Sequence, residues 1–137
     1  MLRIFLLALF LCTSLLARAE EVGADGLTSS ELSQFLQKLQ AAVASDNVSQ
    51  VQTLVSFPLR VNNNGKSRKV NAAQFASSYA SIFTPKIKSV LAAQKASALF
   101  RNSEGAMVGD GEIWMSGICK DKACKQSQVM VITVNVP

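Results

Sequence analysis

Five side chains in this 137-residue sequence have the chemistry to hold or convert a small molecule. Arg60 offers a guanidinium in a predicted strand, Tyr79 a hydroxyl on a predicted helix, and Asp110 and Glu112 two carboxylates close to Trp114. A guanidinium pairs with carboxylates or phosphates through a planar fork of N–H donors. An indole supplies a flat apolar surface. These five residues therefore predict a pocket that binds a small ligand.

Catalysis by the same residues is the less favoured interpretation. The sequence contains no histidine, the commonest general base and the commonest metal ligand. Most of the nine carboxylates lie in the N-terminal tail or at helix ends, where they cap helices or remain solvated. An acid–base pair of Tyr79 with Asp110 or Glu112 stays open, because spacing does not show whether these residues converge. We expect no catalytic residue, no metal and no cofactor.

Each of these residues also has a purely structural interpretation. Asp110 would be a turn residue, Glu112 a surface residue of a strand, and Tyr79 a core aromatic with its hydroxyl at a rim. A single tryptophan in a small domain usually belongs to the core. If Glu112 and Trp114 instead share the concave face of a sheet, the buried charge of Glu112 needs a partner. Arg60 is the candidate for that partner.

The first nineteen residues, 1–19, have the pattern of a removable export signal. One positive charge at Arg3 precedes an apolar run over residues 4–17, which is too short to span a bilayer. Small side chains precede the predicted cleavage site after Ala19. A lipid-anchored alternative would use Cys12, but Leu11 in front of it is too large for that motif. We therefore predict a periplasmic or secreted protein that is not attached to a membrane after cleavage.

The remaining chain of about 118 residues is long enough for one domain with its own core. We expect a flexible segment over residues 20–27 and a single α+β domain over 28–137. Cleavage removes two arginines and lowers the net charge from +5 to +3. The only dense basic group, Lys66, Arg68 and Lys69, has no stacking aromatics beside it and is interpreted as a solvated loop. Nucleic acid is therefore not an expected partner.

Two cysteines follow the predicted signal, Cys119 and Cys124, and four residues separate them. In an oxidising compartment this isolated pair should form a disulfide. A redox site would favour two intervening residues. The loop contains Lys120 and Lys122, and a loop held in this way could instead be presented to a partner protein, similar to some periplasmic lysozyme inhibitors.

Helix signals fill the first two thirds of the chain. The segments 28–31 and 71–74 are capping boxes, in which a side chain at each end satisfies a free backbone amide of the other. Apolar residues at three- and four-residue spacing follow over 32–43 and 75–83. Shorter helices are predicted to begin after Asn47 and at Thr84 with Pro85.

Strand signals lie between these helices and after them. Residues 57–62 alternate apolar and polar side chains, and Pro58 places that strand at an edge or beside a bulge. A short strand ends near Val70. Segments 97–102, 106–119 and 126–136 predict a three-stranded meander, with a bulge at residues 109–111 that bends the middle strand.

This order of elements resembles exported bacterial members of the nuclear transport factor 2-like superfamily. The resemblance is carried by FPL at 57–59, YASIFT at 79–84 and GDGEIW at 109–114. It implies a cone-shaped fold, with N-terminal helices packed on a strongly curved antiparallel sheet around a pocket. Enzymes of this superfamily tend to use a pocket Asp or His with a Tyr donor, a role open here to Tyr79 with Asp110 or Glu112.

The sequence thus favours an exported, non-catalytic protein that binds a small ligand. One alternative is a periplasmic protein-interaction or inhibitor module, and a second is a small isomerase- or dehydratase-like enzyme. The expected partner is a small molecule or a protein in the periplasm, and a homodimer is open.

We predict that the exported protein begins at Glu20, because small residues precede this position and a signal peptidase reads such residues. The intact mass of protein recovered from the periplasm should correspond to residues 20–137. A mass that includes Met1, or a lipid adduct on Cys12, would contradict this processing.

Overall fold

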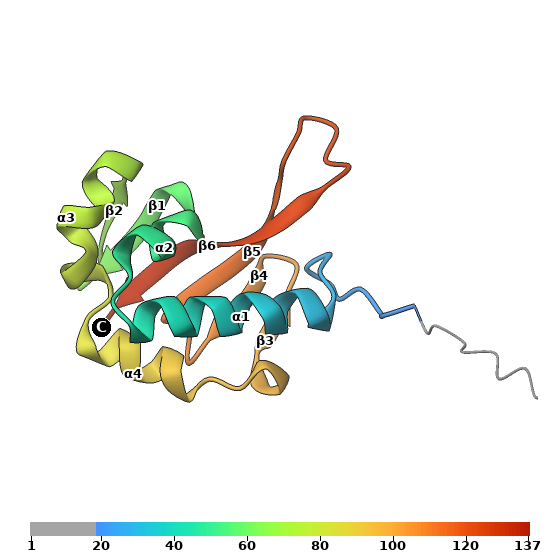
Figure 1. Ribbon diagram of the computed structural model, residues 1–137, viewed down its shortest axis with the longest axis horizontal. Helices are drawn as coiled ribbons and strands as arrows, with labels where there is room; N and C mark the ends of the chain where they lie inside the picture. Colours follow the sequence, from blue (N-terminus) through green and yellow to red (C-terminus); the bar gives the residue numbers. More distant parts are fainter. Residues whose placement is uncertain (1–18) are drawn as a thin grey trace, which may run out of the picture.

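The computed structural model describes residues 19–137 and arranges them as an α+β domain (Figure 1). Residues 1–18 of the predicted signal lie outside the described residues. The lipid alternative at Cys12 lies outside them as well. The described part has four α-helices, α1 (Ser29–Ala44), α2 (Val48–Thr53), α3 (Ala72–Ile82) and α4 (Pro85–Ala93). None of its helices has the length and apolar character needed to cross a membrane.

Six strands form one open sheet, in the order β2-β1-β6-β5-β4-β3. Their bounds are β1 (Val55–Asn63), β2 (Lys66–Val70), β3 (Phe100–Asn102), β4 (Gly105–Val108), β5 (Ile113–Cys119) and β6 (Ser127–Val136). The basic group at 66–69 therefore lies in a strand and not in the loop that was expected. The α+β class is confirmed.

Side-chain caps determine where the main helices begin. The Thr28 hydroxyl accepts from the Glu31 backbone N–H at 3.1 Å, and the Glu31 carboxylate accepts from the Thr28 N–H at 2.8 Å. Asn71 and Gln74 make the same reciprocal pair at α3. Both predicted capping boxes are confirmed.

The helices gather on one side of the sheet (Figure 1), and the core fills the space between them. Leu59 and Val61 of β1, Ile113 of β5 and Val131 and Val134 of β6 are all at most 1% exposed. Successive side chains of a strand point to opposite faces. The residues between these core positions therefore lie on the other face of the sheet, called here the uncovered face.

The sheet is mixed, because β1 pairs with β6 in parallel and every other pair is antiparallel. The expectation of an antiparallel sheet is therefore wrong for this pair. Between the partners Val55 with Val131 and Arg60 with Thr133, the register of β1 shifts. Pro58 lies in this irregular stretch, where its missing N–H removes no regular ladder bond. Of the two expectations for Pro58, the position beside a bulge is confirmed.

The predicted bulge at residues 109–111 is a turn. Gly109 and Gly111 have φ angles of 63° and 108°, which glycine adopts without steric cost. The chain reverses there, so that Val108 of β4 pairs with Ile113 of β5. The predicted single strand 106–119 is therefore two strands, and the meander has four strands instead of three. A glycine pair around an aspartate suits a tight turn as well as a bulge, which explains the error.

Two residues at the end of the segment 20–27, Asp25 and Leu27, contact the domain, whereas the flexibility expected of this segment stays a prediction. Arg101 of β3 donates from Nε to Asp25 Oδ2 at 2.8 Å and from a terminal nitrogen to Asp25 Oδ1 at 2.6 Å. The same guanidinium donates to the Leu27 carbonyl oxygen, and the Leu27 side chain is 1% exposed. A fully covered Asp25 side chain and a core leucine thus hold the N-terminal turn against β3.

The hairpin between β5 and β6 projects from the body of the protein (Figure 1). Cys119 and Cys124 lie at disulfide distance near its tip, with Cα atoms 4.8 Å apart, as predicted. The residues from 119 to 128 are all exposed. A disulfide here therefore constrains a loop that has little packing of its own.

Replacement of both cysteines by serine should lower the free energy of unfolding by roughly 2 kcal/mol, because the unfolded chain loses a short closed loop. Urea unfolding of the double variant and of the wild type, the latter with and without reductant, measures this difference. Free thiols titrated in unfolded, non-reduced periplasmic protein would show that no bridge forms.

Candidate functional site

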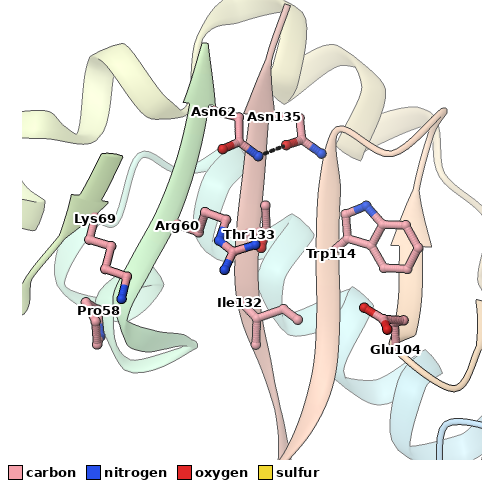
Figure 2. Close-up of a pocket in the computed structure, with 9 residues that line it drawn as sticks. All are labelled: Pro58, Arg60, Asn62, Lys69, Glu104, Trp114, Ile132, Thr133 and Asn135. Atoms are coloured by element: carbon pink, nitrogen blue, oxygen red, sulfur yellow. Dashed lines mark hydrogen bonds between the residues drawn. The ribbon is translucent and has the colours of Figure 1, made fainter. Parts of the chain in front are cut away.

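A groove of about 550 Å³ lies on the uncovered face of the sheet. Its walls come from β1, β2, β5, β6 and the turn between β3 and β4, and they carry positive, carboxylate, amide, hydroxyl, aromatic and apolar groups. The lining residues are Pro58, Arg60, Asn62, Lys69, Glu104, Trp114, Ile132, Thr133 and Asn135. Figure 2 shows these side chains in front of the strands, on the side turned away from α1.

The register of β6 brings Arg60 and Trp114 into this groove. Thr133 pairs with Arg60 of β1 on one side and with Trp114 of β5 on the other. Directly paired residues project from the same face of a sheet. Neighbouring strands lie about 4.8 Å apart, so the backbones of Arg60 and Trp114 are roughly 10 Å apart. Two of the five predicted site residues thus flank one threonine.

A bulge in β6 widens the apolar floor between them. Trp114 pairs with Thr133, but the next residue of β5, Met115, pairs with Val131. Ile132 is the extra residue, and both Ile132 and Thr133 line the groove. The bulge therefore places an isoleucine and a threonine next to each other on a face where strict alternation would allow only one of them.

The positive groups of the groove have no protein partners. Neither Arg60 nor Lys69 makes an ion pair or side-chain hydrogen bond with any residue that the structure describes. Both side chains are exposed at one end of the groove. Glu104 lies at the other end, beside the Trp114 ring (Figure 2). The groove is therefore positive at its β1–β2 end and has one carboxylate at its β3–β4 end.

Two amides close one side of the groove. Asn62 donates from Nδ2 to Asn135 Oδ1 at 2.6 Å, and Asn135 donates from Nδ2 to the Gly111 carbonyl oxygen at 2.5 Å. This chain fixes the orientation of both amides. Within the described residues, the side-chain oxygen of Asn62 and the hydroxyl of Thr133 have no further partner, which leaves both for a ligand.

Sequence reasoning missed five polar members of this site, which are Asn62, Lys69, Glu104, Thr133 and Asn135. Alternation along the first strand places Asn62 beside Arg60, and that signal was available. Thr133 and Asn135 share a face with Arg60 only because a strand some 70 positions later pairs in parallel with β1, and no local pattern indicates this pairing.

Tyr79 lies elsewhere, in the helical layer. Its ring stacks on Phe83 with centroids 5.1 Å apart, and its side chain is buried. The hydroxyl donates to Asp46 Oδ1 at 3.4 Å, and the Lys88 ammonium also donates to that oxygen at 2.5 Å. The prediction that Tyr79 borders one cavity with Arg60 and Trp114 is therefore wrong, because α3 covers the opposite face of the sheet.

Asp110 and Glu112 also lie outside the groove. They occupy the turn between β4 and β5, where Glu112 accepts from the Asp110 backbone N–H at 2.6 Å. They border a separate hollow of about 230 Å³ beside the C-terminal residues. Because Glu112 precedes β5, it does not continue the strand face of Trp114. The anticipated pairing of Glu112 with Arg60 is replaced by the turn contact.

This arrangement can bind an acid and pack a flat group, but it does not assemble the acid–base pair that was left open. Tyr79 meets Asp46, and the carboxylates of Asp110 and Glu112 lie in a turn away from it. No protein-family model, no curated protein and no solved structure matches this chain. The functional conclusion therefore depends on the geometry of the groove.

Tyr79 and Asp46 have opposite pKa shifts. Burial, reinforced by the negative charge of Asp46, raises the pKa of Tyr79 to about 12. The hydrogen bond from Lys88 lowers the pKa of Asp46 below its usual value. A tyrosine in the unfolded chain ionises near pH 10. Between about pH 10 and 12 the folded state therefore binds more protons than the unfolded state.

We predict that the stability contributed by protonated Tyr79 is complete below about pH 10 and is lost as the pH rises toward 12. The melting temperature of Tyr79→Phe should fall less over this window than that of the wild type. Tyr79 is the only tyrosine, so ultraviolet absorbance of tyrosinate reports its ionisation directly. A tyrosinate midpoint near pH 10 in the folded protein would contradict the shift.

Proposed function

We propose that this chain is an exported binding protein that holds a small acidic molecule in the groove and does not convert it. One observation carries the proposal. The unpartnered guanidinium of Arg60 and the half-buried indole of Trp114 flank Thr133 in a groove of about 550 Å³.

The chemistry of each wall supports this proposal. A guanidinium without a protein partner offers both arms of its fork to a carboxylate or phosphate. The Trp114 ring offers a flat surface for an apolar or ring-shaped part of the same molecule. The groove volume lies in the range of known small-molecule sites.

Non-catalytic binding is favoured over an isomerase- or dehydratase-like enzyme because Tyr79 is engaged by Asp46 in the helical layer. Export to the periplasm is favoured by the signal pattern and by the cysteine pair, since disulfides persist in oxidising compartments.

Membership of the nuclear transport factor 2-like superfamily, with its cone-shaped curvature, is part of the same proposal. The order of two helices, a hairpin, two helices and a meander supports it. The core fills the helix-covered face of the sheet in this chain, so the ligand would occupy the uncovered face.

A second candidate is a protein-interaction module, favoured by the projecting hairpin. Lys120, Lys122 and Lys125 are exposed on this loop with one acidic residue, Asp121. The cysteine pair pre-orders the loop, which lowers the entropy cost of binding. An acidic cleft on a periplasmic protein would fit this positive tip.

Arg60→Ala should lower the affinity for an acidic ligand by about tenfold to hundredfold, because a hydrogen bond to a charged group is lost. The probes are benzoate and phenyl phosphate, with benzyl alcohol as the neutral comparison. Trp114 is the only tryptophan, so its fluorescence reports this groove alone. Mass spectrometry of molecules that co-purify with the periplasmic protein identifies the natural ligand.

Arg68→Ala is the matched control, because Arg68 lies on β2 but faces the other side and donates to the Ser81 hydroxyl. It should retain wild-type binding. If Arg60→Ala binds the co-purified molecule as well as the wild type, and substitution of Lys120 and Lys122 abolishes binding to a co-purified partner, the groove proposal is wrong and the hairpin candidate replaces it.

A further inference from the structure

Two positive side chains project from directly paired positions on neighbouring strands of the groove, and Figure 2 shows Arg60 extending toward Thr133 and Lys69 toward Pro58. The register of β1 with β2 pairs Arg60 with Lys69. Like charges directly opposite one another destabilise a sheet. No acidic side chain among the residues lining this end offsets them, because Glu104 lies past Trp114 at the other end (Figure 2). This end of the groove therefore carries two positive charges that no acidic side chain compensates, and a bound anion would compensate both.

We infer that Arg60 and Lys69 together bind the dianion of a phosphomonoester, whose organic part packs against Trp114. This inference rests on the proposed function and names the class of its ligand. A phosphomonoester carries nearly two negative charges at neutral pH, since its second pKa is about 6. A carboxylate carries only one and would leave one of the two cations uncompensated.

The two cations suit different parts of the same phosphate. The guanidinium of Arg60 can donate two parallel hydrogen bonds to two phosphate oxygens. The ammonium of Lys69 acts as a point charge on a flexible stem and can approach a third. The Thr133 hydroxyl lies between Arg60 and Trp114, where it can donate to the ester. Each polar group at this end then has a role with one ligand.

The alternation of side chains along β2 keeps the neighbouring positive residues, Lys66 and Arg68, out of this site. Residues of β2 alternate between faces, so Lys66 and Arg68 project to the side opposite Lys69. The Arg68 guanidinium donates to Ser81 of α3, which confirms its direction. The site is therefore a pair of positive charges and not a diffuse basic surface, and its charge matches one dianion.

The first test compares phenyl phosphate with benzoate, using Trp114 fluorescence of the full mature protein. Phenyl phosphate should bind at least about tenfold more tightly at pH 8, because it satisfies both cations. Its affinity should fall as the pH is lowered through about 6, where it becomes a monoanion. Benzoate affinity should not fall across the same step.

The second test separates binding from structure with Lys69→Gln and its matched control Lys66→Gln. Lys69→Gln should remove the preference for phenyl phosphate and keep benzoate binding. Without ligand its melting temperature should equal or exceed that of the wild type, because one of two uncompensated positive charges at paired positions is removed. Lys66→Gln should change neither the preference for phenyl phosphate nor the binding of benzoate. A purely structural role for Lys69 would lower the melting temperature and leave the preference unchanged, which would overturn the inference.

Failure of the inference and failure of the proposed function give different results. Equal affinity for phenyl phosphate and benzoate in the wild type overturns the inference of a phosphomonoester ligand. It leaves the proposal of an acid-binding groove in place. No response of Trp114 to either probe overturns both. Vesicles of phosphatidylcholine with and without phosphatidic acid distinguish the source. Binding only with phosphatidic acid, competed by phenyl phosphate, supports a lipid phosphomonoester, and binding of phenyl phosphate alone supports a soluble one.

Discussion

The register of the central strand β6 determines which residues lie on the helix-covered face of the sheet and which lie on the uncovered face. It is hydrogen-bonded to β1 on one side and to β5 on the other, so its position fixes which residues of three strands point into the core. Val131 and Val134 are both fully buried although three positions separate them, which strict alternation forbids. The extra residue, Ile132, resolves this conflict. The same bulge leaves Thr133 on the uncovered face between Arg60 and Trp114, so core packing and groove have one cause.

The ion pairs in the described residues join separate segments of the fold, whereas the groove cations Arg60 and Lys69 take part in no ion pair. Asp25 with Arg101 anchors the N-terminal turn to β3, and Asp46 with Lys88 joins the turn after α1 to α4. Each of these charges is compensated within the fold. Arg60 and Lys69 lie on a rigid sheet without such compensation. The sheet orders the backbone under both cations, so the proposed anion would have to immobilise only the two exposed side chains.

The packing on the helix-covered face explains why Tyr79 does not border the groove. The resemblance to a pocket-bearing superfamily implied a pocket between the helices and the sheet. A pocket between helices and sheet would require Tyr79 to face the strand residues across a cavity. Instead Phe57, Phe75, Tyr79 and Phe83 pack edge-to-face and stacked in that space. Apolar burial on this side stabilises the fold and fills the space between Tyr79 and the strands. The uncovered face is free of that requirement and carries the polar groups.

The sequence by itself determined the features that depend on near neighbours. Capping boxes at Thr28 and Asn71 need residues three apart, the cysteine pair closes a short loop, and alternation set Arg60 opposite Leu59 and Val61. Residues 109–111 were ambiguous even locally, because glycines suit a turn and a bulge alike. Only the tertiary structure decided the parallel pairing of β1 with β6, the face that the helices cover, and hence that Arg60 joins Lys69, Thr133 and Trp114 but not Tyr79. Such contacts join segments far apart in the chain, and their partners are chosen by the burial of a whole face, which no local spacing encodes.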